Sequence, residues 1–334
     1  MRPRMHSIPL TRVAVLRGVV AFLGRIGTPV DRLLEQVGLR PEVFDEEEGL
    51  IPLRLGMRFM ELAARTEGIE HLGFRAGLAT AIETLGTFGR VLRCSRSLAG
   101  ALEAASSLGP KFNSGERFWL EVEGPRVHFC HLYLSPEGEF RQAEEYALSL
   151  ALNVVRLAAG PDWVPADLRL QSTMPRPPRT LLTSVRMLPG EPLAGFTFPR
   201  ALLDRRLPDP HGVPAVREED MLRWDRSAPA SDLPGSVHQV IDALSGDLRP
   251  KIGTIAGAIG ISVRSLQRRL ASAGVSYDRL VDDGNLAGAA ELLRGPDKII
   301  DVAMAMGYSD PAHFSRAFRR WTGLCPREFR RQAL

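Results

Sequence analysis

Three side chains whose types and spacing suit base recognition stand together near the C-terminal end of the chain. Arg264, Gln267 and Arg268 are spaced i, i+3 and i+4, which places them on one face of a helix. Arginine and glutamine side chains match the hydrogen-bonding edges of guanine and adenine in the major groove. Leu266 and Leu270 fall on another side as a core stripe. The spacing therefore predicts a helix that offers its polar face to a nucleic acid.

A second polar face of the same design follows in the stretch SDPAHFSRAFRRWTG. Phe314 and Phe318, four residues apart, point one way into a core. Their spacing leaves Ala312, His313 and Arg316 on the sides and the opposite face. We expect these three residues to contact bases as well. An amphipathic surface helix with solvated arginines is the alternative for either stretch taken alone.

Side chains that border the two polar faces are suited to phosphate contacts. Serine hydroxyls at helix N-termini and flanking arginines are common phosphate ligands in protein–DNA complexes. We expect this role for Ser262, Arg269, Ser309, Arg319 and Arg320. Ser262 and Ser309 are also placed to cap their helices. Asp310 adds negative charge to the first turn after Ser309, and Pro311 lies where a missing N–H costs nothing.

The elements that position both faces are two helix–turn–helix units. Thr254 to Leu270 reads as a helix, a turn at Gly260 and a second helix; Ile299 to Arg330 repeats this order around Gly307. Between them, Tyr277 to Arg294 predicts an 18-residue helix, about 27 Å long at 1.5 Å per residue. Two glycines inside it, Gly284 and Gly288, each cost roughly 1 kcal/mol of helix stability relative to alanine.

The C-terminal hundred residues resemble the DNA-binding domain of the AraC/XylS family of bacterial transcription regulators. The first unit matches at Ala256, Gly260, Ser262, Arg264, Leu266, Arg268 and Leu270. The second matches at Ala303, Gly307, Tyr308, Phe314, Ser315, Arg316, Phe318, Trp321, Gly323, Pro326 and Phe329. The resemblance implies two helix–turn–helix units that enter successive major grooves. Asn285 stands where the family usually carries an arginine, which implies either looser coupling of the units or a weaker phosphate or intradomain contact.

The charge distribution agrees with a C-terminal DNA-binding region. The net charge of the whole chain is +4. From Arg249 to the end there are fourteen Lys and Arg against eight Asp and Glu, so the preceding part of the chain is slightly acidic. A basic excess in one region neutralises phosphates when it faces a duplex.

The N-terminal half combines helices with a small, mostly antiparallel sheet. Arg117 to Val122 and Arg126 to Leu134 alternate around Glu123-Gly124-Pro125 and predict a β-hairpin. Further apolar patterns predict helices at 11–25, 52–62, 97–108 and 141–159 and short strands at 168–171 and 196–198. The fold class is therefore multi-domain: an α+β N-terminal domain and an all-α C-terminal domain.

An aromatic set on the hairpin is the candidate pocket for a small organic effector. It comprises Trp119, Phe129, His131 and Tyr133. Few charged residues accompany it, which favours an apolar or amphipathic effector. Plain core packing is the alternative for these aromatic side chains.

Roughly residues 15 to 208 resemble the N-terminal effector domain of one AraC/XylS branch, the arabinose-binding, ornithine-utilisation-regulator-like type. The resemblance is carried by the order of elements, by LGTFG and SRSLAGALEAASS, and by the closing FTFPRALLDRRLPDP. We expect an effector-binding and dimerisation domain at 1–208, a linker at 209–234 and the DNA-binding domain at 235–334.

Enzyme chemistry finds little support in the sequence. His128 and His131 are three apart on a strand and so face opposite sides, which is unsuitable for a shared metal. Glu144 and Glu145 are adjacent on a helix and point about 100° apart, which is poor for paired-carboxylate catalysis. No G-x-S-x-G, P-loop or G-x-G-x-x-G motif is present. We expect no catalytic site, metal or cofactor.

The remaining expectations concern partners and compartment. We expect double-stranded DNA with promoter half-sites as the target, a homodimer, and RNA polymerase as a partner if the protein is an activator. Three scattered cysteines favour a reducing cytoplasm. The apolar N-terminal stretch is interrupted by Arg17 and predicts an amphipathic helix rather than a signal peptide or membrane span. An architectural DNA-binding protein without an effector is the alternative, and the size of the N-terminal half weighs against it.

Overall fold

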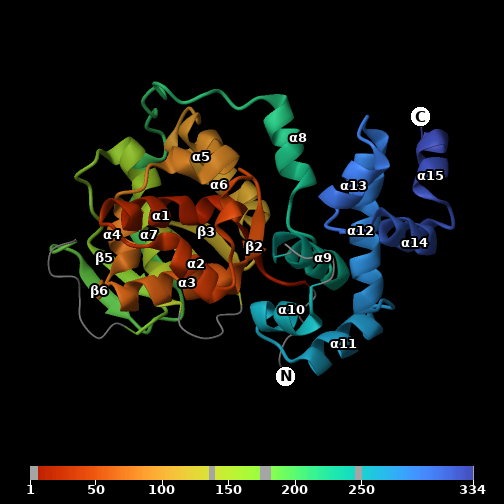
Figure 1. Ribbon diagram of the computed structural model, residues 1–334. Coiled ribbons are helices and arrows are strands. Elements are labelled where there is room, and N and C mark those ends of the chain that lie inside the picture. Colours follow the sequence, from red (N-terminus) through yellow and green to blue (C-terminus); the bar gives the residue numbers. More distant parts are fainter. Residues whose placement is uncertain (1–6, 135–139, 174–181, 245–249, 334) are drawn as a thin grey trace. The chain divides into compact units, whose positions relative to one another are not determined.

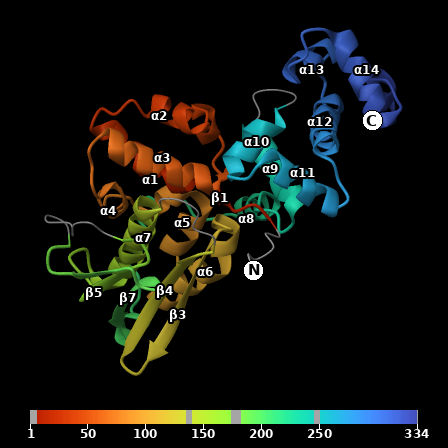
Figure 2. The same ribbon diagram turned by 90° about the horizontal axis from the view of Figure 1, so that it is seen from below.

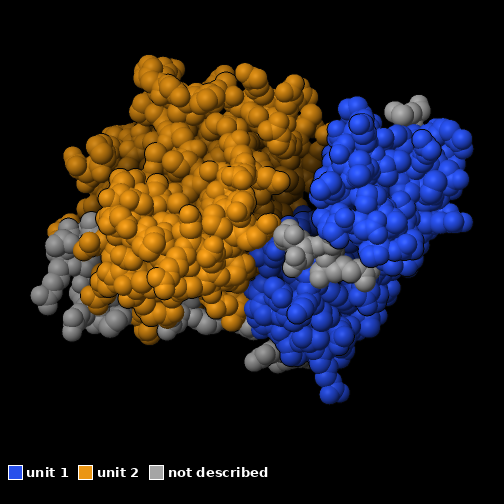
Figure 3. All heavy atoms as spheres, in the orientation of Figure 1, with its two compact units in different colours: residues 1–8, 230–334 blue, residues 9–229 orange. Residues whose placement is uncertain are grey.

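The computed structural model describes residues 7–134, 140–173, 182–244 and 250–333. The chain forms two compact units, shown in different colours in Figure 3. One unit, here called the effector unit, is Pro9–Pro229. The other, here called the DNA-binding unit, joins Met1–Ile8 to Ala230–Leu334.

Helices of the effector unit cover a five-stranded sheet, as predicted for an α+β domain (Figure 1). Its helices are α1 (Ala14–Arg25), α2 (Val30–Val37), α3 (Leu53–Thr66), α4 (Leu72–Leu78), α5 (Gly86–Arg93), α6 (Leu98–Phe112), α7 (Arg141–Ala159) and α8 (Glu218–Arg226). Short 3-10 turns occupy η1 (Pro41–Phe44), η2 (Ile82–Leu85) and η3 (Arg200–Leu202).

The larger sheet has the strand order β3-β4-β7-β5-β6, of which β3, β4, β7 and β5 are labelled in Figure 2. Its strands are β3 (Glu116–Glu123), β4 (Arg126–Tyr133), β5 (Asp167–Leu170), β6 (Arg186–Pro189) and β7 (Ala194–Pro199). Only β5 and β6 pair in parallel among these strands. A separate two-stranded sheet pairs β1 (Leu10–Arg12) with β2 (Leu50–Pro52). The predicted hairpin is confirmed, and Glu116 lies opposite Tyr133 in its register.

The alternation of side chains between the two faces of the hairpin determines which of them join the core. Phe118 lies opposite His131 and Leu120 opposite Phe129, so these residues share the face that the helices cover. Trp119 lies opposite Cys130 on the other face.

The segment 209–234, which the sequence predicts as a linker, contains a helix in the structure. This helix, α8, carries Trp224, whose side chain has no exposed surface and belongs to the main core of the effector unit. Burial of a large aromatic side chain removes 150–250 Å² from water, which is enough to hold a short helix on a core. The effector unit therefore continues through α8 to Pro229.

The DNA-binding unit is all-helical. Its helices are α9 (Leu233–Leu244), α10 (Ile252–Ile259), α11 (Val263–Ser272), α12 (Tyr277–Arg294), α13 (Ile299–Ala305), α14 (Pro311–Thr322) and α15 (Pro326–Ala333). Both helix–turn–helix units are present, and α12 has the predicted bounds. No helix in the described ranges has the length and apolar character of a membrane span.

Candidate DNA-binding surface and effector cavity

The first candidate base-reading face lies on α11. Gly260 adopts φ of +79°, a left-handed conformation that ends α10 and turns the chain toward α11. The Ser262 hydroxyl accepts a hydrogen bond from the Ser265 amide at 3.2 Å, so the predicted N-cap is confirmed. Leu266 and Leu270 are fully buried. Their burial fixes the rotation of α11 about its axis.

The rotation of α11 leaves Arg264, Gln267 and Arg268 exposed on its outer side. Within the described residues their side chains have no hydrogen-bond or ion-pair partner. An unpaired, solvent-facing guanidinium keeps all its donors available for a ligand. The three side chains that the sequence singles out are thus brought together on one accessible face.

The second candidate face lies on α14. Phe314 and Phe318 are fully buried with ring centroids 5.7 Å apart, while Ala312, His313 and Arg316 are exposed. The core consists of Ala289, Leu293, Val302, Ala303, Phe314 and Phe318, so α12 and α13 supply its other walls.

The N-cap of α14 differs from the sequence prediction. Asp310, and not Ser309, accepts the capping hydrogen bond, from the Ala312 amide at 2.8 Å. Pro311 then occupies the first helical position, as expected. Because Pro311 sets the start of the helix, the residue immediately before it becomes the cap. Ser309 stays exposed outside the helix.

The candidate phosphate contacts have different surroundings in the structure. Ser262, Ser309 and Arg319 are exposed, and Arg269 is half-buried. Arg320 is also exposed, but its guanidinium lies 3.3 Å from the Asp282 carboxylate of α12. This ion pair ties α14 to the connecting helix, a role that sequence spacing did not indicate.

The packing of the connecting helix explains one of its two glycines. A Cβ atom on Gly284 would lie 2.6 Å from Nε2 of His238, which belongs to α9. The His238 ring is held by Asp242, whose carboxylate lies 2.9 Å from Nδ1, and this hydrogen bond raises the pKa of His238. Gly284 therefore makes room for α9 against α12. A Cβ atom on Gly288 would have only Met306 nearby, with Sδ at 3.7 Å, which is ordinary van der Waals contact.

The effector unit contains a cavity of about 100 Å³ between its helices and the sheet. Most of its lining is apolar. Examples from five helices and the hairpin are Leu16, Met60, Phe88, Phe112, Phe118 and Leu150. Of the predicted pocket residues, Phe129, His131 and Tyr133 line it. Trp119 does not line it, because its position in β3 places it on the other face of the hairpin.

Several polar groups in the cavity wall already have hydrogen-bond partners within the effector unit. The His131 Nε2 atom lies 3.0 Å from a Glu116 carboxylate oxygen, and His131 is only 2% exposed. The Asn113 side chain accepts a hydrogen bond from the Gly115 amide. Burial, helped by the charges of Glu116 and Glu144, raises the pKa of Tyr133 well above its ordinary value, so its phenol stays neutral. The wall therefore presents little unpaired charge to a ligand.

Glu144 and Glu145, the adjacent carboxylates considered for catalysis, both have hydrogen-bond or ion-pair partners within the effector unit. Glu144 accepts hydrogen bonds from the amides of Gln171 and Ser172 at the end of β5. Glu145 pairs with His71 at 2.9 Å and with Arg141 at 3.0 Å. Among the described residues, no three His, Cys, Asp or Glu side chains are grouped as a metal site.

A helical unit with two exposed helix–turn–helix faces, attached to an α+β unit with an internal cavity, defines a class of two-domain DNA-binding proteins. Comparison with known families agrees with this class. Residues 27–207 match the arabinose-binding N-terminal domain of AraC transcription regulators, and residues 255–332 match a helix-turn-helix domain. Because the first match covers more than half of the chain, the chain belongs to the AraC family of transcription regulators.

Individual relatives are of the same kind. The chain is 22% identical over 337 residues to the ornithine utilization regulator of Pseudomonas aeruginosa, covering 98% of both chains. It is 24% identical over 346 residues to the regulator VirS of Mycobacterium tuberculosis, covering 96% of both. An uncharacterized HTH-type regulator of the latter organism is 29% identical over 174 residues, so the match spans half of that relative's length and 51% of this chain.

Proposed function

We propose that the protein is a transcription regulator that binds promoter DNA through α11 and α14 and responds to a small molecule in the effector unit. The observation that carries the proposal is the pair of exposed faces, Arg264, Gln267 and Arg268 on α11 and Ala312, His313 and Arg316 on α14, each backed by a buried core. Ser262, Arg269, Ser309, Arg319 and Arg320 would contact phosphates beside them.

The connecting helix supports reading of two grooves by one chain. Its 18 residues span about 27 Å, and successive major grooves on one side of B-DNA are about 34 Å apart. Recognition helices that lie toward the two ends of such a spacer are suited to neighbouring grooves. A homodimer would present four such helices to promoter half-sites, and an activator would in addition contact RNA polymerase. These contacts would take place in the cytoplasm.

The test for base reading compares two arginine variants of the full-length protein. Arg268→Ala should lower discrimination at one base-pair position by about 1 to 3 kcal/mol. The control is Arg279→Ala, which removes the same charge from an exposed site paired with Asp283 on α12. Binding of each variant to a library of site variants by fluorescence anisotropy gives the discrimination. Unchanged preference in Arg268→Ala, or equal loss in both variants, would refute the assignment.

The effector proposed here is a small, uncharged, apolar or amphipathic molecule. The cavity wall offers hydrophobic side chains, and two of its polar groups, the Glu116 carboxylate and the His131 ring, already contact each other at 3.0 Å. A sugar would leave many hydroxyls without partners in such a wall, and each unsatisfied buried polar group costs about 1 to 3 kcal/mol. An architectural protein without an effector would not need this cavity.

Ligand class is tested by thermal unfolding with two probes. Cyclohexanol should raise the unfolding temperature of the effector unit, because a ligand that binds only the folded state stabilises it. Arabinose should leave it unchanged. In Ala105→Leu, which places a larger side chain in the cavity wall, the effect of cyclohexanol should disappear. A shift with arabinose alone would contradict the apolar assignment.

A further inference from the structure

A stack of three aromatic rings links the cavity wall to α8. Phe88 and Phe112 line the cavity and stack on each other with centroids 4.5 Å apart. Trp224 stacks on both, at 6.2 Å from each and within 12° of parallel. Trp224 itself is not part of the cavity lining. It therefore lies one layer behind the wall, where a displacement of either phenylalanine ring would reach it.

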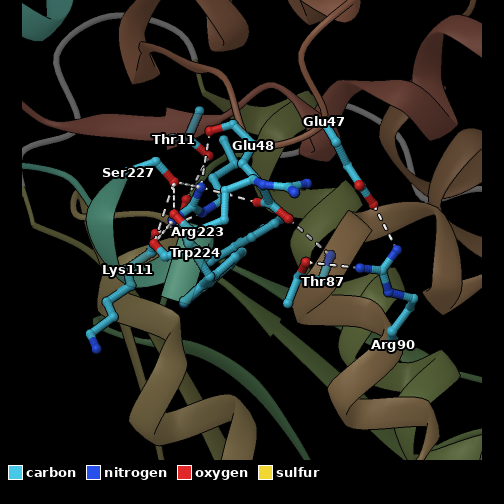
Figure 4. A network of polar contacts seen from close by, with 11 residues as sticks. Thr11, Glu47, Glu48, Thr87, Arg90, Lys111, Arg223, Trp224 and Ser227 are labelled. Atoms are coloured by element: carbon cyan, nitrogen blue, oxygen red, sulfur yellow. Dashed lines mark hydrogen bonds and ion pairs between the residues drawn. The ribbon is translucent and has the colours of Figure 1, made fainter. Parts of the chain in front are cut away.

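Arg12 makes several contacts at once on the other side of this arrangement, and Figure 4 labels its partners Glu48, Trp224 and Ser227. Its guanidinium carbon lies 3.6 Å from the Trp224 ring centroid. Its nitrogens donate to the backbone carbonyls of Trp224 at 2.7 Å, of Glu48 at 2.9 Å and of Lys111 at 3.1 Å, and to the Ser227 hydroxyl at 2.9 Å. A further nitrogen–oxygen distance of 3.0 Å joins it to the Glu48 carboxylate.

Because Arg12 is buried, the hydrogen-bond geometry of its guanidinium is tightly constrained. The residue has no exposed surface, and burial, opposed by Glu48, lowers its pKa to about 10. A guanidinium taken out of water is tolerated only when its fork of donors is satisfied. A movement of Trp224 by a few tenths of an ångström would stretch several of these bonds together, so Arg12 and α8 are expected to move as one.

Arg12 also joins the two chain segments that lead into the DNA-binding unit. Residues Leu10–Arg12 form β1, and only Pro9 separates this strand from Ile8, whose amide donates to the Ser236 hydroxyl of α9 at 2.8 Å. Ser227 and Trp224 stand just before Ala230, where the DNA-binding unit resumes. Both covalent connections between the units therefore pass within a few residues of the Arg12 contacts.

We propose that Trp224 and Arg12 transmit the state of the cavity to the DNA-binding unit. A ligand that displaces Phe88 or Phe112 changes the stack on Trp224, and Arg12 converts that change into a coupled shift of α8 and β1. Both are positioning residues, since neither touches the ligand. The proposal rests on the proposed function of the cavity as an effector site.

The experiment fills part of the cavity with a larger side chain, so that it does not depend on an unidentified ligand. Ala105 lines the cavity, and Ala105→Leu adds a branched hydrocarbon group to it. Hydrogen exchange of the full-length protein is followed in peptides from 9–13 and 218–229. We expect exchange in both peptides to change together by about fivefold or more, because local stability responds to packing. The control is Ala99→Leu, which alters the same helix at a position outside the cavity lining.

Variants of Trp224 and Arg12 test whether these two residues transmit the response. In Trp224→Phe and Arg12→Lys backgrounds, Ala105→Leu should alter exchange only in the helices that line the cavity. The proposal is overturned if α8 and β1 do not respond in the otherwise unchanged chain, or if they respond equally in both backgrounds. Binding of the same proteins to promoter DNA is measured in parallel. If the wild-type chain shows no specific DNA binding, the proposed function is contradicted instead.

Discussion

Replacement of each glycine in the connecting helix by alanine should change the stability of the DNA-binding unit differently at the two sites. Alanine in a helix interior is favoured over glycine by about 0.8 to 1 kcal/mol. At Gly288 the added Cβ would have Met306 Sδ as its nearest neighbour, at 3.7 Å, so nothing opposes this gain. We therefore expect Gly288→Ala to stabilise the DNA-binding unit by about 1 kcal/mol.

At Gly284 the same gain is opposed by a close approach. The added Cβ would lie 2.6 Å from His238 Nε2 and 3.3 Å and 3.4 Å from two ring carbons. The ring would have to turn away and weaken its 2.9 Å contact with Asp242. A hydrogen bond to a charged group contributes about 1.5 to 3 kcal/mol when buried, and less at a site that is partly exposed like this one. Gly284→Ala should therefore be neutral or destabilising.

The assay is hydrogen exchange of α12 amides in the full-length protein, with the two variants compared under identical conditions. Exchange should slow in Gly288→Ala by roughly fivefold, the equivalent of about 1 kcal/mol. In Gly284→Ala it should not slow. Adding His238→Ala to Gly284→Ala removes the clash, and the helix should then recover the gain. Equal stabilisation by both single variants would show that His238 does not pack on Gly284, and the reasoning would fail.

Three further predictions concern the DNA-binding unit. Phe318→Ala should lower its stability by about 3 to 5 kcal/mol, measured by urea unfolding, because Phe318 is fully buried against three other aromatic rings; a folded variant with altered base preference would contradict this core role. If Arg320 contacts phosphate, Arg320→Ala should reduce the slope of log affinity against log salt by about 0.9, whereas Asp282→Asn, which removes its partner on α12, should not reduce it. Since the folded pKa of His238 is raised by the hydrogen bond to Asp242, its stabilising contribution is fully present below about pH 6.5 and is lost as pH rises through the folded value; His238→Gln should remove that pH dependence of unfolding, and an unchanged profile would count against it.

Local patterns predicted the elements whose stability is local. The alternation around Glu123-Gly124-Pro125 indicated the hairpin, and the bounds 277–294 and 141–159 match α12 and α7. The exposed faces on α11 and α14 also follow from helical periodicity, because Leu266, Leu270, Phe314 and Phe318 are all buried. In these helices the residues that the apolar spacing assigns to the core are the ones that are buried.

Features that depend on distant partners could not be predicted in this way. Strand β1 has three residues, and its pairing with β2 brings together segments from separate parts of the chain. Arg12 reads as an exposed residue in isolation; its burial requires backbone acceptors from the segment before β2, from α6 and from α8. Trp224 lies in a polar, proline-containing segment that has no core pattern, so a helix there was not expected.

The candidate pocket illustrates a smaller error of the same kind. Aromatic content placed Trp119 in the pocket set, but strand period assigns that face to Phe118. Applying the alternation of β4 across the hairpin would have selected Phe118, since His131 lies directly opposite it. Ser309 is a second case: the proline that follows Asp310 fixes the cap at Asp310.

DNA reading by α11 and α14 is tested most directly by a salt titration of DNA binding by the full-length protein. Affinity for a duplex from its own upstream region is compared with affinity for a scrambled duplex of equal composition. We expect specific binding, a log–log salt slope of several units from phosphate contacts, and a reduced preference for the specific duplex in Arg268→Ala. Equal binding of both duplexes at every salt concentration, or no binding of either, would contradict the proposal that α11 and α14 read promoter DNA.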